Sequence, residues 1–292
     1  MAKLLPHTHA TRRVSTSAKR HALVTRTVGF VVMIAVGLFF FLPWLWLVSS
    51  SLKTSQDIFA QPPQWIPSTI EWQNYVNAVT YVPFFKYATN TLLICAGVVL
   101  GRMISCSLVA YGFSKVNWPG RDKVFLLVLM TLMLPFQVTM IPLFVIFRNL
   151  GMIDTPLPLI LPAFFGDAFF IFLLRQFFMR LPTELSEAAR IDGANHFDIY
   201  WRVVLPLSGP ALSTLVVFSF LWTYTDFQGP LVYLSSEDSW TLSLGLRGYL
   251  GAHGGEWSLL MAASVLFTVP VIVLFFVAQR AFIHGIATTG LR

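Results

Sequence analysis

The stretch VGFVVMIAVGLFFFLPWLWLV, Val28–Val48, contains 21 residues without a single charged side chain. A helix rises about 1.5 Å per residue, so such a run can cross the roughly 30 Å hydrocarbon core of a bilayer. The run is longer than the apolar core of a secretory signal peptide, which has about 7–15 residues. We therefore interpret it as an uncleaved first membrane span, and it predicts a helical membrane protein.

The composition of the whole chain agrees with that class. Of its 292 residues, 56% are hydrophobic and 11% are charged, whereas an ordinary soluble domain has about 25% charged residues. This composition excludes a soluble enzyme, which would have too few charged side chains to cover its surface. It also excludes an intrinsically disordered protein, because so large an apolar fraction would make the chain collapse. Five more apolar stretches are long enough to cross a bilayer: Thr91–Phe113, Val124–Phe147, Leu157–Phe178, Leu207–Tyr233 and Leu259–Val277. We predict an all-α membrane protein with six transmembrane helices.

The 20 Lys and Arg residues indicate the orientation of these spans, because cytoplasmic loops are enriched in them. With the N-terminus inside, fifteen of them lie on the cytoplasmic side and four on the other, and Arg102 lies within a span. We predict that both termini are cytoplasmic. Residues 1–26 form a disordered basic tail near anionic headgroups, and residues 27–292 form the transmembrane domain. The net charge of +7 thus follows topology and does not indicate a nucleic-acid partner.

The longest internal cytoplasmic segment, residues 180–206, is the most informative part of the chain. Thr183 can cap a helix over Glu184–Asp192, and Gly193 suits the left-handed position that follows a helix. This helix has a stripe of small apolar side chains formed by Leu185, Ala188 and Ala189. Such a stripe permits close approach by a partner and has little bulk to insert into a membrane. We predict a docking surface for a cytoplasmic protein.

A second helix is predicted over His196–Val204, capped by Asn195 and terminated by Pro206. It has a bulky stripe formed by Phe197, Tyr200, Trp201 and Val204. This stripe is expected to pack against membrane-facing parts of the same chain. An amphipathic helix lying flat on the membrane is the alternative for this second helix.

The order Glu187-Ala188-Ala189, three residues, Gly193, nine residues, Val203-x-Leu205-Pro206 resembles the EAA loop of permease subunits of bacterial ABC importers. Valine stands where isoleucine is usual. Residues 134–142, 257–264 and 279–285 are similar to the carbohydrate-uptake branch, whose members include the maltose and glycerol-3-phosphate systems. Residues 223–227 depart from the Trp-Asn-Asp-Phe of many relatives but retain Asp226.

The resemblance implies a MetI-like permease bundle in the bacterial inner membrane that imports a sugar or a related polar solute. It implies three partners: a second permease, a dimer of ABC ATPases and an extracytoplasmic solute-binding protein. The chain would form half of the translocation path without enzymatic activity. It has no nucleotide-binding loop, so ATP and Mg would be used by the ATPase. The coupling residues implied are Glu187, Ala188, Ala189, Asp192, Gly193, Leu205 and Pro206.

Four charged residues lie within the predicted spans: Arg102, Asp167, Asp226 and, near the cytoplasmic end of its stretch, Arg175. Exposing Arg102 to lipid would cost about 2.5–3.5 kcal/mol, and Arg102 borders a stripe of small residues formed by Gly97, Gly101 and Ser105. This stripe favours close helix packing. We expect Arg102 to face protein or water, either paired with Asp167 or Asp226 or acting on the solute or in gating. Snorkelling of its side chain without a functional role is the remaining alternative.

The third stretch contains Pro135 and Pro142, which a regular helix cannot both accommodate. The freed carbonyl groups must be buried in protein or line a wet cavity. Candidate residues of the translocation path are Gln137, Thr139, Tyr224 and Asp226. Simple kinked packing explains the two prolines equally well.

Two other function classes compete with an importer subunit. Asp167 and Asp226 could belong to the proton relay of an ion-coupled secondary transporter, but neither has a histidine nearby in sequence. A membrane-embedded enzyme would need clustered acids, bases or metal ligands, and the sequence shows no such cluster or metal-site spacing. Cys95 and Cys106, about 16 Å apart along one helix, are too distant for a disulfide.

Overall fold

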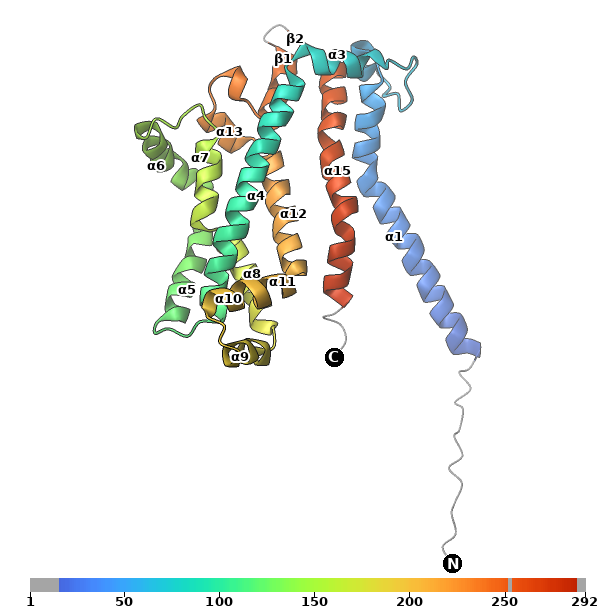
Figure 1. The fold of residues 1–292 in the computed structure, drawn as a ribbon. Helices are drawn as coiled ribbons and strands as arrows, with labels where there is room; N and C mark the ends of the chain where they lie inside the picture. Colours follow the sequence, from blue (N-terminus) through green and yellow to red (C-terminus); the bar gives the residue numbers. More distant parts are fainter. Residues whose placement is uncertain (1–15, 252–253, 288–292) are drawn as a thin grey trace, which may run out of the picture.

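The computed structural model describes the backbone of residues 16–251 and 254–287, and most of it is helical (Figure 1). The helices longer than twelve residues are α1 (Thr16–Ser51), α4 (Phe84–Ser114), α6 (Phe136–Asn149), α8 (Ala168–Arg180), α12 (Gly209–Thr225) and α15 (Trp257–Ala287). The shorter helices are α2 (Ser55–Ile58), α3 (Gln73–Tyr81), α5 (Arg121–Met130), α7 (Leu157–Ile160), α9 (Thr183–Ile191), α10 (His196–Ile199), α11 (Leu205–Leu207), α13 (Gln228–Tyr233) and α14 (Leu242–Gly245). Strands β1 (Leu250–Gly251) and β2 (Gly254–Gly255) form a short antiparallel pair.

Among the described residues, four helical stretches are long and apolar enough to cross a membrane: Thr25–Ser51, Phe84–Ser114, Leu157–Arg180 and Trp257–Gln279. Two bent pairs raise that number to six if each is one span. One pair is residues 121–133 with α6, bent by 96°, and the other is residues 196–207 with α12, bent by 77°. The all-α class is confirmed, with four to six candidate spans.

Several predicted boundaries were wrong, and proline explains one of them. The third stretch breaks at Leu134, an extended residue before Pro135, because a residue before proline avoids the helical region. Pro142, in contrast, lies inside α6. The fifth stretch ends at Thr225 because Asp226 is extended. At the other end of the chain, α1 begins at Thr16, so residues 16–26 are helical rather than disordered, and residues 1–15 lie outside the described part.

Helix α4 runs through the middle of the bundle and packs against α8, α12 and the segment around α7 (Figure 1). The predicted small-residue stripe makes this packing possible. A Cβ atom on Gly97 would lie 2.8 Å from Ile160, and one on Gly101 would lie 2.8 Å from the Phe164 ring. The third member, Ser105, donates to the Ala163 carbonyl at 2.8 Å. The close approach of α4 to residues 160–164 therefore depends on this stripe.

At the end of the bundle that carries α3, one carboxylate fixes two loops together. Asp154, at φ 66°, accepts hydrogen bonds from the Ser239 hydroxyl at 2.6 Å and from the Ser235 and Ser236 amides at 2.9 Å. These bonds, the Ser239 hydroxyl first, hold the pKa of Asp154 well below its usual range. The carboxylate therefore fastens the connection between α6 and α7 to the loop that follows α13.

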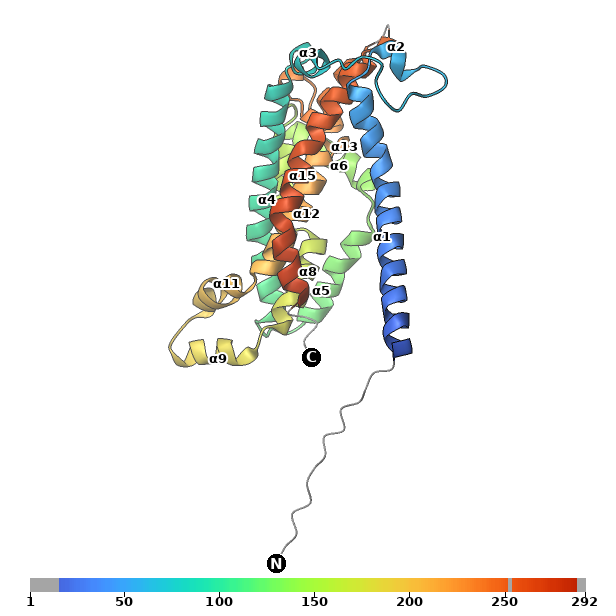
Figure 2. The ribbon, with the colours of Figure 1, turned by 90° about the vertical axis from the view of Figure 1, so that its right-hand side faces the viewer.

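The opposite end of the bundle carries α9, α10 and α11. Figure 1 shows that α1 begins and α15 ends at this same end. Figure 2 shows α9 lying across it, roughly at right angles to the long helices. The segment predicted to couple to a partner thus lies outside the bundle, at the end where both terminal helices lie.

Candidate functional site

The coupling segment, residues 180–206, begins with α9, which starts at Thr183 and ends at Ile191, one residue from the prediction at each end. Pro182, not Thr183, takes the capping position. The amide of Asp192 donates to the Ala188 carbonyl at 3.0 Å. Gly193 then adopts φ 86°, the left-handed geometry that the sequence predicted.

The exposed side of α9 differs from the predicted stripe. Leu185 and Ala188 are exposed, together with Glu187, whereas Ala189 is half-buried and packs against the chain's own core. Ile191 has 87% of its surface exposed and was not predicted to belong to this surface. Ala189 thus helps to hold α9, while the free side carries larger apolar side chains than expected.

The second helix of the coupling segment starts as predicted but does not end at Pro206. Asn195 accepts from the Phe197 and Asp198 amides at 2.8 and 3.0 Å, completing a capping box with the Asp198 side chain. A π-helical turn, Tyr200–Val204, then leads into α11. Pro206 lies in the first turn of α11, where its missing N–H is tolerated, so the chain stays helical to Leu207.

The bulky stripe of this second helix is only half-buried. Tyr200 and Val204 are buried as expected, together with Ile199. Phe197 and Trp201 are instead exposed. The buried face is therefore rotated around the helix axis relative to the predicted one. As a result, the two large aromatic side chains of Phe197 and Trp201 are left exposed.

Hydrogen bonds join this segment to α4. The Tyr200 hydroxyl lies 2.8 Å from the Ser107 hydroxyl, and the Tyr111 hydroxyl lies 3.2 Å from His196 Nδ1. The Lys115 ammonium donates to the Leu181 carbonyl at 2.9 Å. These bonds fix the coupling segment to α4.

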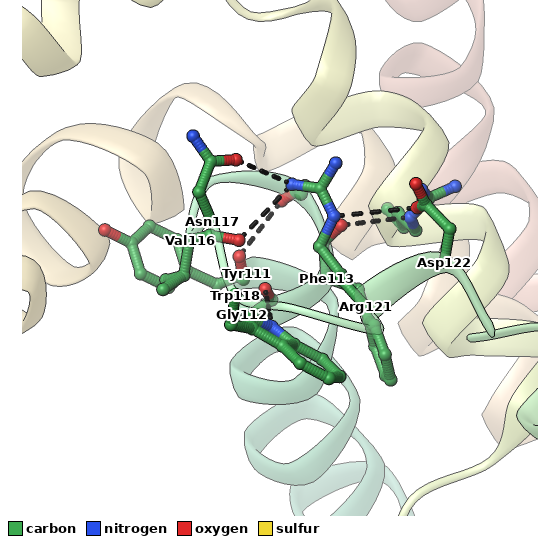
Figure 3. A network of polar contacts seen from close by, with 10 residues as sticks. Tyr111, Gly112, Phe113, Val116, Asn117, Trp118, Arg121 and Asp122 are labelled. Carbon is green, nitrogen blue, oxygen red and sulfur yellow. Dashed lines mark hydrogen bonds and ion pairs between the residues drawn. The ribbon is translucent and has the colours of Figure 1, made fainter. Parts of the chain in front are cut away.

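A second polar network ties α8 to the junction of α4 and α5. Arg175 Nη2 lies 2.9 Å from Asp122 Oδ1, and its Nε donates to the Phe113 carbonyl at 3.1 Å. Figure 3 shows the neighbouring part, where Arg121 Nη1 donates to Asn117 Oδ1 at 3.1 Å. Sequence reasoning counted Arg175 only as a cytoplasmic charge. Its role depends on contacts with distant residues, which no local pattern shows.

Arg102 is paired with Asp167, not with Asp226. Its Nη2 lies 3.1 Å from Asp167 Oδ2, and its Nη1 donates to the Ser219 hydroxyl at 3.1 Å. Asp167 also caps α8 by accepting from the Phe169 amide at 3.0 Å. The pair therefore links α4, α8 and α12 inside the bundle.

A polar cavity of about 270 Å³ lies between α4, α12 and the segments around α7 and α13. Its polar and aromatic lining consists of Thr91, Arg102, Trp222, Thr223, Asp226 and Thr241. Arg102 and Asp226, which lie far apart in the sequence, thus border one space. Among the described residues, no three His, Cys, Asp or Glu side chains come together as metal ligands.

The other residues predicted for the translocation path do not join this cavity. Gln137 and Thr139 lie on α6, away from its lining. Tyr224 is buried, donates to the Phe267 carbonyl at 3.0 Å and stacks on the Phe267 ring at 4.7 Å between centroids. Tyr224 therefore holds α12 to α15, and only Asp226 of the four lines the cavity.

The chain is similar to known transport proteins over most of its length. It is 34% identical over 269 residues to an arabinooligosaccharides transport system permease protein, AraQ, of Halalkalibacterium halodurans, a match that covers 91% of this chain and 95% of that protein. It is 33% identical over 264 residues to an sn-glycerol-3-phosphate transport system permease protein, UgpE, of Escherichia coli, covering 88% and 93%.

The fold is also shared with a solved structure. A chain from a bacterial ABC transporter involved in the import of the acidic polysaccharide alginate aligns with a TM-score of 0.77 at 24% identity, covering 92% of this chain and 99% of the other. The family model described as a binding-protein-dependent transport system inner membrane component matches residues 97–288. The chain therefore belongs to the family of inner membrane components of binding-protein-dependent transport systems, the permease subunits of ABC importers.

Proposed function

We propose that this chain is one of two permease subunits of an ATP-driven sugar importer and that it crosses the membrane six times with both termini in the cytoplasm. The observation that carries the proposal is the position of α9. In a chain of this family, α9 lies outside the bundle at the end where α1 begins and α15 ends, with Ala188 exposed. Arabinooligosaccharides and glycerol 3-phosphate, named for two relatives, define the solute class to be tested.

The coupling segment is proposed to bind a dimer of separate ATPase subunits, which hold ATP and Mg. A groove of about 480 Å³ lies between the end of α4 and α9, lined in part by Lys115, Ser186, Glu187, Arg190 and His196. Charged side chains of both signs and the exposed apolar residues next to them suit a polar-rimmed protein interface. The same segment includes Asp192, which caps the end of α9, and Leu205 and Pro206, which begin α11. Movement of the ATPases would then reach α4 through its hydrogen bonds with this segment.

A second permease is proposed to contact α1. This helix packs on α15, with Trp44 Nε1 donating to Thr268 at 3.4 Å, but its apolar side chains from Val28 to Leu42 are mostly exposed. Figure 2 shows α1 standing apart from the rest of the bundle over much of its length. An extracytoplasmic solute-binding protein is proposed to dock at the end of the bundle that carries α3, opposite α9. A fold relative solved in complex with an alginate pentasaccharide-bound periplasmic protein supports a partner of this kind.

The joint after α9 offers a direct test. In Gly193→Val, a β-branched residue must adopt φ 86°, which costs at least about 1–2 kcal/mol. No atom lies within 4 Å of a Cβ placed there, so the effect comes from the backbone rather than from a clash. We expect at least a tenfold loss of ATP-dependent sugar uptake in proteoliposomes, with ATP hydrolysis retained.

Gly193→Asn is the matched control, because asparagine tolerates the left-handed region, and it should keep most of the uptake. Assembly of all variants with the partner subunits is checked by co-purification. Normal uptake by assembled Gly193→Val would contradict the coupling role of this joint.

A further inference from the structure

The polar cavity extends along one side of α4. Its lining includes Thr91 and Arg102, which lie eleven residues apart, about 16 Å at 1.5 Å per residue. Its volume of about 270 Å³ is just below the roughly 300–1,000 Å³ of pockets for drug-sized ligands. The space therefore suits one sugar unit rather than a long chain.

Arg102 lines this cavity and has one nitrogen that the protein leaves without a partner. Nη1 and Nη2 have partners, but Nε is buried and has no hydrogen-bond partner among the described residues. A buried donor left without a partner costs about 1–3 kcal/mol. Nε is closed off from the cavity in this structure, so a bound molecule would reach it only after a shift of the Arg102 side chain.

Acceptors lie on the other side of the space. Asp226 accepts from the Gly229 amide through Oδ1 at 3.1 Å and from the Gln228 amide, which still leaves capacity on a carboxylate with about four acceptor sites. A Cβ atom on Gly229 would lie 2.5 Å from Asp226 Oδ2, so the glycine is what permits this position. The Thr223 hydroxyl, which both donates and accepts, has no hydrogen bond within the described part of the chain. Sugar hydroxyl groups, which also donate and accept, match this set.

An aromatic ring completes the lining. The Trp222 indole rests against Phe169 and Phe170, with centroids 5.2 and 5.3 Å away, and the residue is still 45% exposed. A rigid ring of this kind offers an apolar face to the C–H groups of a sugar. Polar groups beside one aromatic face are a typical arrangement for recognising a polyol.

The charges around the cavity select between sugar classes. The positive charge of Arg102 is already paired with Asp167 at 3.1 Å, and Asp226 adds a second carboxylate. The site thus has no net positive charge to attract a phosphate or a uronate, and an anion would meet Asp226 in a poorly screened environment. We propose that the polar cavity holds one unit of a neutral sugar during import and rejects anionic solutes, an inference that rests on the proposed importer function.

Cysteine accessibility in the assembled complex tests this proposal. The T223C variant is co-purified with its partner subunits, placed in nanodiscs and treated with the membrane-impermeant thiol reagent MTSET, with and without ATP. Cys95 and Cys106 are both buried, so the wild-type complex measures the background. We expect 10 mM arabinotriose or maltotriose to slow labelling of T223C at least threefold and 10 mM sn-glycerol 3-phosphate to leave it unchanged. The matched variant T225C, exposed on the same helix but outside the cavity, should show no sugar protection.

Uptake by the wild-type complex separates failure of this inference from failure of the importer assignment. ATP-dependent uptake of arabinotriose or maltotriose with no protection of T223C would overturn the cavity proposal and leave the importer function intact. Protection or uptake of glycerol 3-phosphate instead would overturn the neutral-sugar class. Absence of ATP-dependent uptake of all three compounds would contradict the importer assignment, whereas sugar protection of T223C would still support the cavity.

Discussion

At the scale of single residues, the ion pair between Arg102 and Asp167 shows how the bundle accommodates charge within the membrane. Their side chains are 18% and 25% exposed, so the pair is largely desolvated. Removing one partner of a buried pair leaves an uncompensated charge and costs more than removing both. Asp167 also caps α8, so the pair joins three helices.

We therefore expect Arg102→Met to lower the thermal unfolding midpoint of the assembled complex, at a cost approaching about 3 kcal/mol. The double variant Arg102→Met, Asp167→Asn should regain part of that loss, because no charge is then left unpaired. Scanning fluorimetry of the complex in detergent measures both. Lys86→Met is the control, because its pair with Asp238 is exposed and such pairs contribute little. A double variant no more stable than Arg102→Met alone would contradict this role of the ion pair.

The sequence predicted some residue positions and missed others for a physical reason. Gly193 was identified because left-handed backbone geometry selects glycine, and Arg102 was placed facing protein because lipid exposure is costly. Tyr224 was assigned to the translocation path, yet it holds α15. Whether a buried hydroxyl group faces a neighbouring helix or a cavity depends on the packing angle, which no local pattern encodes.

At the scale of elements, the second coupling helix is held to α4 by side-chain hydrogen bonds as well as by packing. The π-helical turn Tyr200–Val204 presents Tyr200 to Ser107. π-helical turns are rare in proteins, and many of those that occur lie at functional sites. The apolar runs predicted the approximate positions of the membrane helices, and the Asn195 cap predicted the start of the second coupling helix. The π turn and the breaks at Leu134 and Asp226 were not predicted, because they arise from competition between local chain geometry and tertiary contacts.

The hydrogen bond between the Tyr200 and Ser107 hydroxyl groups is expected to contribute both to the stability of the complex and to coupling. Tyr200→Phe and Ser107→Ala should each lower the free energy of unfolding by about 0.5–1.5 kcal/mol, seen as a lower thermal unfolding midpoint. Each should also lower the ratio of sugar transported to ATP hydrolysed. The double variant should lose little more than the larger single effect, because the two groups share one bond. Fully additive losses in this cycle would show that the hydroxyl groups act independently.

At the scale of the whole molecule, the end that carries the coupling segment, residues 180–206, lies opposite the end that carries α3. The hydrogen bonds of Asp154 with the loop after α13 lie at the α3 end. The polar cavity lies between these ends, bordered by the same α4 that contacts the coupling segment. Hydropathy predicted the fold class, and the EAA resemblance predicted the family. Neither could predict the cavity, because its lining comes from residues brought together only by packing.

If a separate ATPase holds α9, a photo-reactive group on the exposed side of this helix should crosslink to that ATPase. The reactive amino acid p-benzoylphenylalanine replaces Ala188 in the complex purified with its partner subunits, and irradiation is repeated without nucleotide, with ATP and with a non-hydrolysable analogue. Phe40, 75% exposed on α1, is the control position. We expect position 188 to give a covalent product of this chain with the ATPase and position 40 to give none. Adducts with lipid alone, or no adduct in any nucleotide state, would contradict it.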